Sequence, residues 1–157
     1  MNVRRLQLTV ALGILALSIF ECFQAYPHLP DPMASTFGGD GMPGGWSSKK
    51  GFVIIYAVSM AFWFGALLAA PLIAAHARQN FDPATRQWLG DTIAWFLLAS
   101  LAFSAAVTHW VLEANLVTGR LSTGFVWLLT IYMAYMVWWT VRLVRRARAF
   151  SISARPK

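Results

Sequence analysis

Residues 29–49 read L-P-D-P-M-A-S-T-F-G-G-D-G-M-P-G-G-W-S-S-K, and they lie between two long apolar runs at residues 6–20 and 51–75. Proline and glycine are so frequent in this stretch that neither a helix nor a regular strand is expected. A polar, turn-rich segment between two membrane-length runs has to lie outside the hydrocarbon, because its backbone N–H and C=O groups need partners. The sequence therefore predicts an outer loop over residues 27–50 that joins two transmembrane helices.

The loop can be aligned without gaps to the pattern L-P-D-x-I-P-x-H-F-N-x-x-G-x-x-D-G-W-G-S-K. The identical positions are Leu29, Pro30, Asp31, Phe37, Gly41, Gly45, Trp46, Ser48 and Lys49. The loop thus resembles the extracytoplasmic signature of bacterial membrane proteins related to the SdpI immunity protein. The family His falls on Thr36, its Asn on Gly38 and its second Asp on Gly44, so the most polar positions of the pattern differ.

The resemblance implies a non-enzymatic protein of the bacterial cytoplasmic (inner) membrane with an immunity or signalling role. Its partners would be an extracytoplasmic peptide, another membrane protein or a second copy of itself. The loop residues that would make these contacts are Leu29, Pro30, Asp31, Phe37, Gly41, Trp46 and Lys49. From their apolar side chains, Leu29, Phe37 and Trp46 are also expected to fold the loop over the helix ends or to present it to a partner.

The composition is that of a membrane protein. Of 157 residues, 58% are hydrophobic and 12% are charged, whereas about a quarter of residues are charged in soluble domains. The net charge of +7 is distributed over short segments between apolar runs, which is typical of membrane topology and argues against nucleic-acid binding. Cys22 is the single cysteine, so no internal disulfide can form.

Four apolar segments are long enough to cross a bilayer. We expect an all-α integral membrane bundle, one membrane domain over residues 1–157, with spans at about 6–26, 51–75, 92–112 and 122–141. The first segment also resembles a secretory signal peptide, but no small-x-small cleavage site follows it, so a retained helix ending at Pro27 is expected. Asp82-Pro83 predicts a helix start, and Pro71 predicts a kink.

Lysine and arginine placement predicts the orientation. All of them except Lys49, Lys50 and Arg120 lie on the side that holds both termini, and the positive-inside rule places that side in the cytoplasm. The basic tail, residues 142–157, then faces the anionic inner leaflet.

Four ionisable residues are expected near the outer membrane surface: Glu21, His28, His109 and Glu113. His109 and Glu113 are four apart and share a helix face. The favoured interpretation is structural: Glu21 pairs with Lys49, Lys50 or Arg120, while His109 and Glu113 bond to the loop. No cofactor or metal is therefore expected. The alternative functions are an accessory subunit of a larger transport or energy-conversion complex and, with less support, a metal- or haem-binding membrane enzyme.

Overall fold

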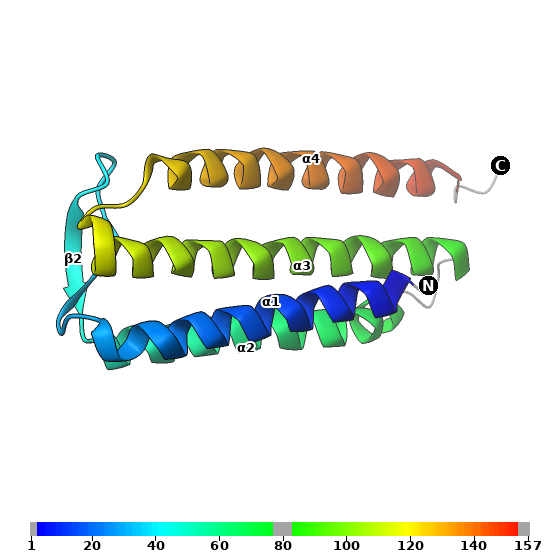
Figure 1. Ribbon diagram of the computed structural model, residues 1–157. Coiled ribbons are helices and arrows are strands. Elements are labelled where there is room, and N and C mark those ends of the chain that lie inside the picture. The colour runs from blue at the N-terminus through cyan, green and yellow to red at the C-terminus, as the bar shows by residue number, and fades with distance from the viewer. Residues whose placement is uncertain (1–2, 77–82, 154–157) are drawn as a thin grey trace. The chain divides into compact units, whose positions relative to one another are not determined.

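The computed structural model describes residues 3–76 and 83–153, and it is mostly helical (Figure 1). Its long helices are α1 (Val3–Ala25), α2 (Lys49–His76), α3 (Pro83–Glu113) and α4 (Thr123–Ser153). Each of these four helices is long and apolar enough to cross a membrane, which confirms the expected number of candidate spans in this part of the chain. The chain divides into two compact units, Met1–Ser122 and Thr123–Lys157, so that α4 forms the second unit.

The first unit is built on α3, which packs against both α1 and α2, whereas α1 and α2 make few contacts with each other. Leu67 of α2 and Leu101 of α3 are fully buried in the core between them. The small side chains of Ala11, Ala70 and Ala94 are buried in the same cluster. Small residues let helix backbones approach closely, and this packing is the main attraction between helices in a membrane.

The helices extend beyond the predicted spans at several ends. α3 begins at Pro83, as the Asp82-Pro83 signal predicted, although Asp82 itself lies outside the described residues. α2 continues through Pro71 to His76, and α4 continues to Ser153, so the described part of the basic tail is helical. Helical backbone hydrogen bonds can form outside the apolar part of a segment as well. A helix can therefore extend beyond the apolar residues from which its span was predicted.

The segment between α1 and α2 contains a β-hairpin, and the prediction that it holds no regular strand is wrong. Strand β1 (Met33–Phe37) pairs antiparallel with β2 (Pro43–Ser47), and the register shifts on both sides of Thr36. These irregularities explain how the hairpin tolerates its composition. Pro43 is the first residue of its strand, a position where the missing N–H is harmless. Within residues 3–76 and 83–153, the regular structure is therefore helical except for this two-stranded sheet.

Candidate functional site

Asn115 fixes the hairpin to the helices. It lies in the π-helical turn η2 (Ala114–Thr118) that follows α3. Its Oδ1 accepts the backbone N–H of Ala34 at 2.7 Å, and its Nδ2 donates to the Ala34 carbonyl at 2.9 Å and to the Val111 carbonyl at 2.8 Å. One side-chain amide thus satisfies both outward-facing backbone groups of a strand residue that is only 3% exposed. The sequence placed Asn115 in a turn but did not predict this contact.

Apolar side chains of the hairpin segment cover the ends of α1 and α3. Leu29 is 4% exposed and Met33 is fully buried, and both pack with Ala25 of α1 and Leu112 of α3. Phe37 is partly buried against the same cluster. Of the three apolar residues expected to cover the helix ends or to face a partner, Leu29 and Phe37 pack over the helix ends and Trp46 does not. Met33 is an additional member of this contact.

The tip of the hairpin is tied to the chain that follows η2. Gly41 has a φ of 78°, in the left-handed region that favours glycine. Its carbonyl accepts the Leu121 N–H at 2.8 Å, and a Cβ atom at this position would lie 2.7 Å from the Leu121 carbonyl oxygen. Gly41 is therefore required both for its backbone conformation and for the close approach. Gly45 leaves room for a side chain of the facing strand, because a Cβ there would lie 2.4 Å from Thr36 Oγ1.

Asp31 and Ser48 define the beginning of α2. Asp31 Oδ1 accepts the Lys49 N–H at 3.3 Å, and Ser48 Oγ accepts the Gly51 N–H at 3.1 Å. Side-chain oxygens in these positions satisfy N–H groups that have no partner within the helix. The Lys49 ammonium lies 5.1 Å from the ring centroid of Tyr26, within the range of a cation–π interaction. Asp31 therefore contacts the backbone N–H of Lys49, whereas the Lys49 ammonium contacts Tyr26.

Trp46 is the member of the signature with the largest exposed apolar surface. It lies on β2 opposite Ala34, and 61% of it is exposed. Pro30 and His28 are also exposed, in and beside the 3₁₀ turn η1 (Tyr26–His28). The candidates therefore separate into two groups. Leu29, Asp31, Phe37 and Gly41 hold the hairpin in place, whereas Trp46 is presented outward.

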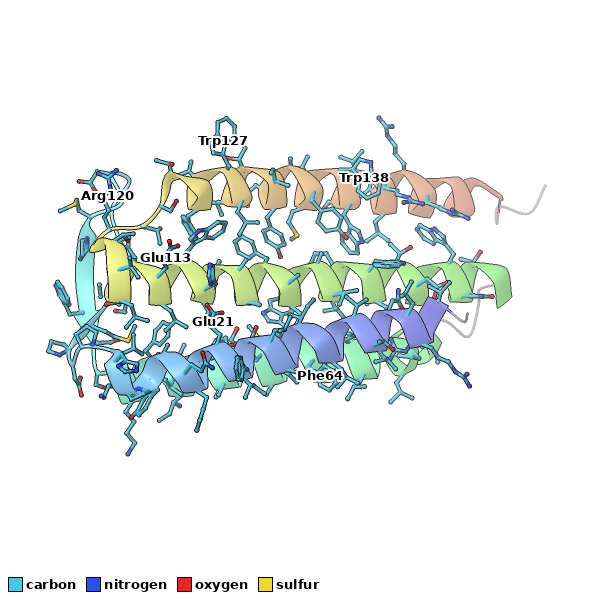
Figure 2. All side chains as sticks on the ribbon, in the orientation of Figure 1. Glu21, Phe64, Glu113, Arg120, Trp127 and Trp138 are labelled. Carbon is cyan, nitrogen blue, oxygen red and sulfur yellow. The ribbon has the colours of Figure 1, made fainter. Side chains whose placement is uncertain are left out.

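Glu21 of α1 projects toward α3, where its Oε1 and Nδ1 of His109 form an ion pair (Figure 2). The expected pairing of Glu21 with Lys49, Lys50 or Arg120 is not the one formed, because the helix contact brings His109 closer. Glu113 lies one turn further along α3 (Figure 2), and His28 is exposed. No group of three His, Cys, Asp or Glu residues suited to a metal ion occurs within residues 3–76 and 83–153.

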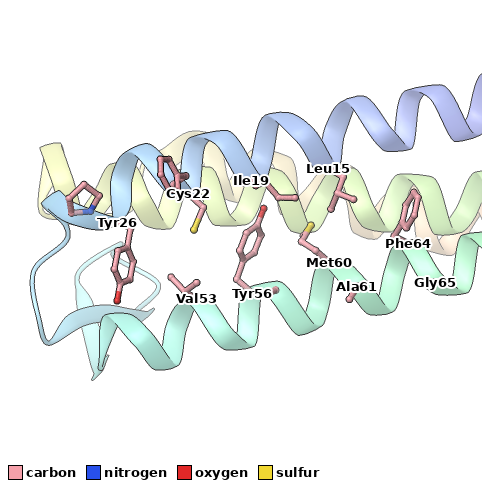
Figure 3. A pocket seen from close by; sticks show the side chains of 13 residues that line it. Leu15, Ile19, Cys22, Tyr26, Val53, Tyr56, Met60, Ala61, Phe64 and Gly65 are labelled. Atoms are coloured by element: carbon pink, nitrogen blue, oxygen red, sulfur yellow. The ribbon is translucent and has the colours of Figure 1, made fainter.

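An apolar groove of about 810 Å³ lies between α1 and α2 (Figure 3). Leu15, Ile19 and Cys22 line it from α1, and Tyr56, Met60 and Gly65 line it from α2. Tyr26 closes its hairpin end. The groove was not predicted from the sequence, because it depends on both helices packing against α3 in preference to each other.

Comparison of the chain with protein-family models, curated proteins and solved structures finds no match. The functional argument therefore depends on the geometry and on the signature residues themselves.

Proposed function

We propose that this chain is a non-enzymatic, multi-pass protein of the bacterial cytoplasmic membrane that binds a peptide or protein partner at its outer hairpin. Its role would be immunity or signalling of the SdpI-like kind. Both termini would be cytoplasmic, in keeping with the positions of the lysines and arginines. The observation that carries the proposal is the exposed Trp46 on a hairpin that several buried contacts hold in place.

The physical reasoning concerns preorganisation. Binding costs less when the contact surface is already ordered. Asn115, Met33 and Gly41 hold the hairpin on the helices, so Trp46 is presented without an ordering cost. Tryptophan is enriched among residues that dominate binding energy, because it combines a large apolar area with few rotatable bonds. An aromatic residue at the membrane interface also anchors to lipid headgroups, so the test has to separate lipid contact from partner contact.

A photo-crosslinking amino acid placed at position 46 in intact cells makes that separation. Position 127 in α4 is the control, because Trp127 is also a strongly exposed tryptophan. We expect position 46 to form a discrete adduct with an extracytoplasmic peptide or protein. The adduct should be lost when the same chain also carries Asn115→Ala. Lipid adducts alone at position 46, identical to those at position 127, would refute the proposal.

A second function, that of an accessory subunit in a larger membrane complex, is favoured by α4. None of the residues in the apolar window Thr123–Arg146 is buried, and the exposed face includes Ile131, Val137 and Trp138. Purification of the native chain in mild detergent distinguishes the two functions. A defined complex with other membrane proteins supports the subunit role, and a free chain opposes it.

A further inference from the structure

The groove between α1 and α2 has the dimensions of one bilayer leaflet. Its lining runs from Tyr26 in η1 to Leu15 on α1 and from Val53 to Gly65 on α2. At the helical rise of about 1.5 Å per residue, these stretches are roughly 16–18 Å long. The hydrocarbon of a bilayer is about 30 Å thick, so one leaflet contributes about 15 Å. The groove therefore extends from the hairpin end of the spans to about the middle of the membrane.

The groove is apolar, and its volume is that of a ligand site. The volume of about 810 Å³ falls within the range of roughly 300–1,000 Å³ found for small-molecule pockets. Ala57, Ala61 and Gly65 leave space along α2, and a Cβ atom at Gly65 would meet no atom within 4 Å. Leu15 and Met60 lie on the two sides of this long apolar space (Figure 3), which suits an extended hydrocarbon chain.

The end of the groove near the hairpin carries positive charge. The Lys49 ammonium lies over the ring of Tyr26, which itself lines the groove, and exposed Lys50 follows it in the first turn of α2. Two acidic residues are near. Asp31 accepts the Lys49 backbone N–H, and Glu21 is paired with His109. Asp31 contacts only the backbone of Lys49 in this way, so the ammonium groups of Lys49 and Lys50 are two cationic groups at this end of the groove that suit an anion.

These observations together identify an occupant. We propose that the α1–α2 groove holds one acyl chain of an anionic phospholipid from the hairpin-side leaflet, with its phosphate group at Lys49 and Lys50. Moving an acyl chain from the surrounding lipid into an apolar groove changes its free energy little, because both environments are equally apolar. The groove therefore provides shape, and the two lysines provide the preference for an anionic headgroup. This site is separate from the partner surface at Trp46 and does not depend on it.

Photoactivatable lipids test the site directly. The full chain is reconstituted in phosphatidylcholine vesicles that contain a trace of diazirine-labelled phosphatidylglycerol or, in parallel, diazirine-labelled phosphatidylcholine. Cross-linked residues are identified by mass spectrometry. We expect phosphatidylglycerol to label Leu15, Ile19, Met60 and Ala61 roughly 25-fold more strongly than phosphatidylcholine does, because two lysines contribute about five-fold each. A basic side chain near a negatively charged lipid favours it by roughly five-fold, so Lys49→Gln and Lys50→Gln should each reduce the preference by about that factor.

Matched variants separate the groove from general lipid contact. Gly65→Leu obstructs the end of the groove farthest from the hairpin and should reduce the labelling of the neighbouring Met60 and Ala61. Gly13→Leu is its control, because a Cβ at Gly13 also meets no atom within 4 Å but Gly13 does not line the groove. Lys49→Arg should keep the preference, and Arg120→Gln should not change it. Equal labelling by the two lipids, or full labelling of Gly65→Leu, would overturn the proposal.

Discussion

Replacing Asn115 with alanine tests whether one amide side chain anchors the hairpin. The substitution leaves the N–H and C=O of Ala34 without the partners that lie 2.7 and 2.9 Å away. An orphaned buried polar group costs about 1–3 kcal/mol. Asn115 is only partly buried, so water will reach the site and each cost should lie near the lower limit. We expect the hairpin to lose about 2–3 kcal/mol of local stability.

Hydrogen–deuterium exchange measures this loss at the hairpin itself. Amides that exchange by local opening accelerate in proportion to the opening equilibrium. A loss of about 2–3 kcal/mol corresponds to exchange that is roughly 30- to 150-fold faster. The affected amides should be those of β1 and β2, while the amides in the middle of α2 and α3 should keep their protection. Leu29 and Met33 remain buried, so the hairpin should open locally without unfolding the helices.

A second substitution in the same strand provides the control. The Ser35 hydroxyl makes a single long contact of 3.5 Å to the Gly45 carbonyl, so Ser35→Ala should change exchange by only a small factor. Hairpin exchange in Asn115→Ala that is as slow as in Ser35→Ala would refute the reasoning. Faster exchange throughout α2 and α3 would also contradict it, because the side chain would then stabilise the whole bundle.

Three further predictions concern the hairpin tip, the core and the ion pair. Gly41→Ala should accelerate hydrogen exchange at residues 38–42. An alanine costs about 1–2 kcal/mol in the left-handed region, and its Cβ would clash with the Leu121 carbonyl oxygen. Gly39→Ala is the control and should not accelerate exchange, because a Cβ at Gly39 meets no atom within 4 Å. Leu67→Ala should lower the free energy of unfolding in detergent by about 2–3 kcal/mol through the cavity it leaves, whereas Leu68→Ala, at a residue that is 49% exposed, should cost much less. A double-mutant cycle with Glu21→Gln and His109→Gln should give a coupling energy of about 0.2–1 kcal/mol, as for other partly exposed pairs; additive effects would mean that the two side chains do not interact.

The four candidate spans were predictable because hydropathy and length are local properties of the sequence. The start of α3 at Pro83 was predictable for the same reason, since Asp-Pro is a local signal. The exact ends of α3 and α4 were not, because helical hydrogen bonds continue past the apolar residues that hydropathy detects. The hairpin was missed because its strands are short and irregular. The glycines and Pro43 that argue against strands occupy the places where the register shifts or a strand begins.

The candidate site was predictable only in part. The resemblance selected Leu29, Phe37 and Gly41, and the structure gives each of them a role in holding the hairpin. Asn115 carried no sequence signal, because its importance depends on a strand residue 81 positions earlier. The Glu21–His109 pair was missed for a related reason. Charge alone predicted a lysine or Arg120 as the partner of Glu21. The packing of α1 on α3 instead brings His109 next to Glu21.

The contact between Ala34 and Asn115 also has a consequence for the order of events during synthesis. The two residues are 81 positions apart, and protein synthesis adds about 5–20 residues per second. The hairpin segment therefore exists for roughly 4–16 s before the side chain that anchors it has been made. During that interval Leu29 and Met33 have α1 beside them but lack α3. A chaperone or a protease would meet the hairpin in this unanchored state, and the synthesis of Asn115, just after α3, is the step that ends the exposure.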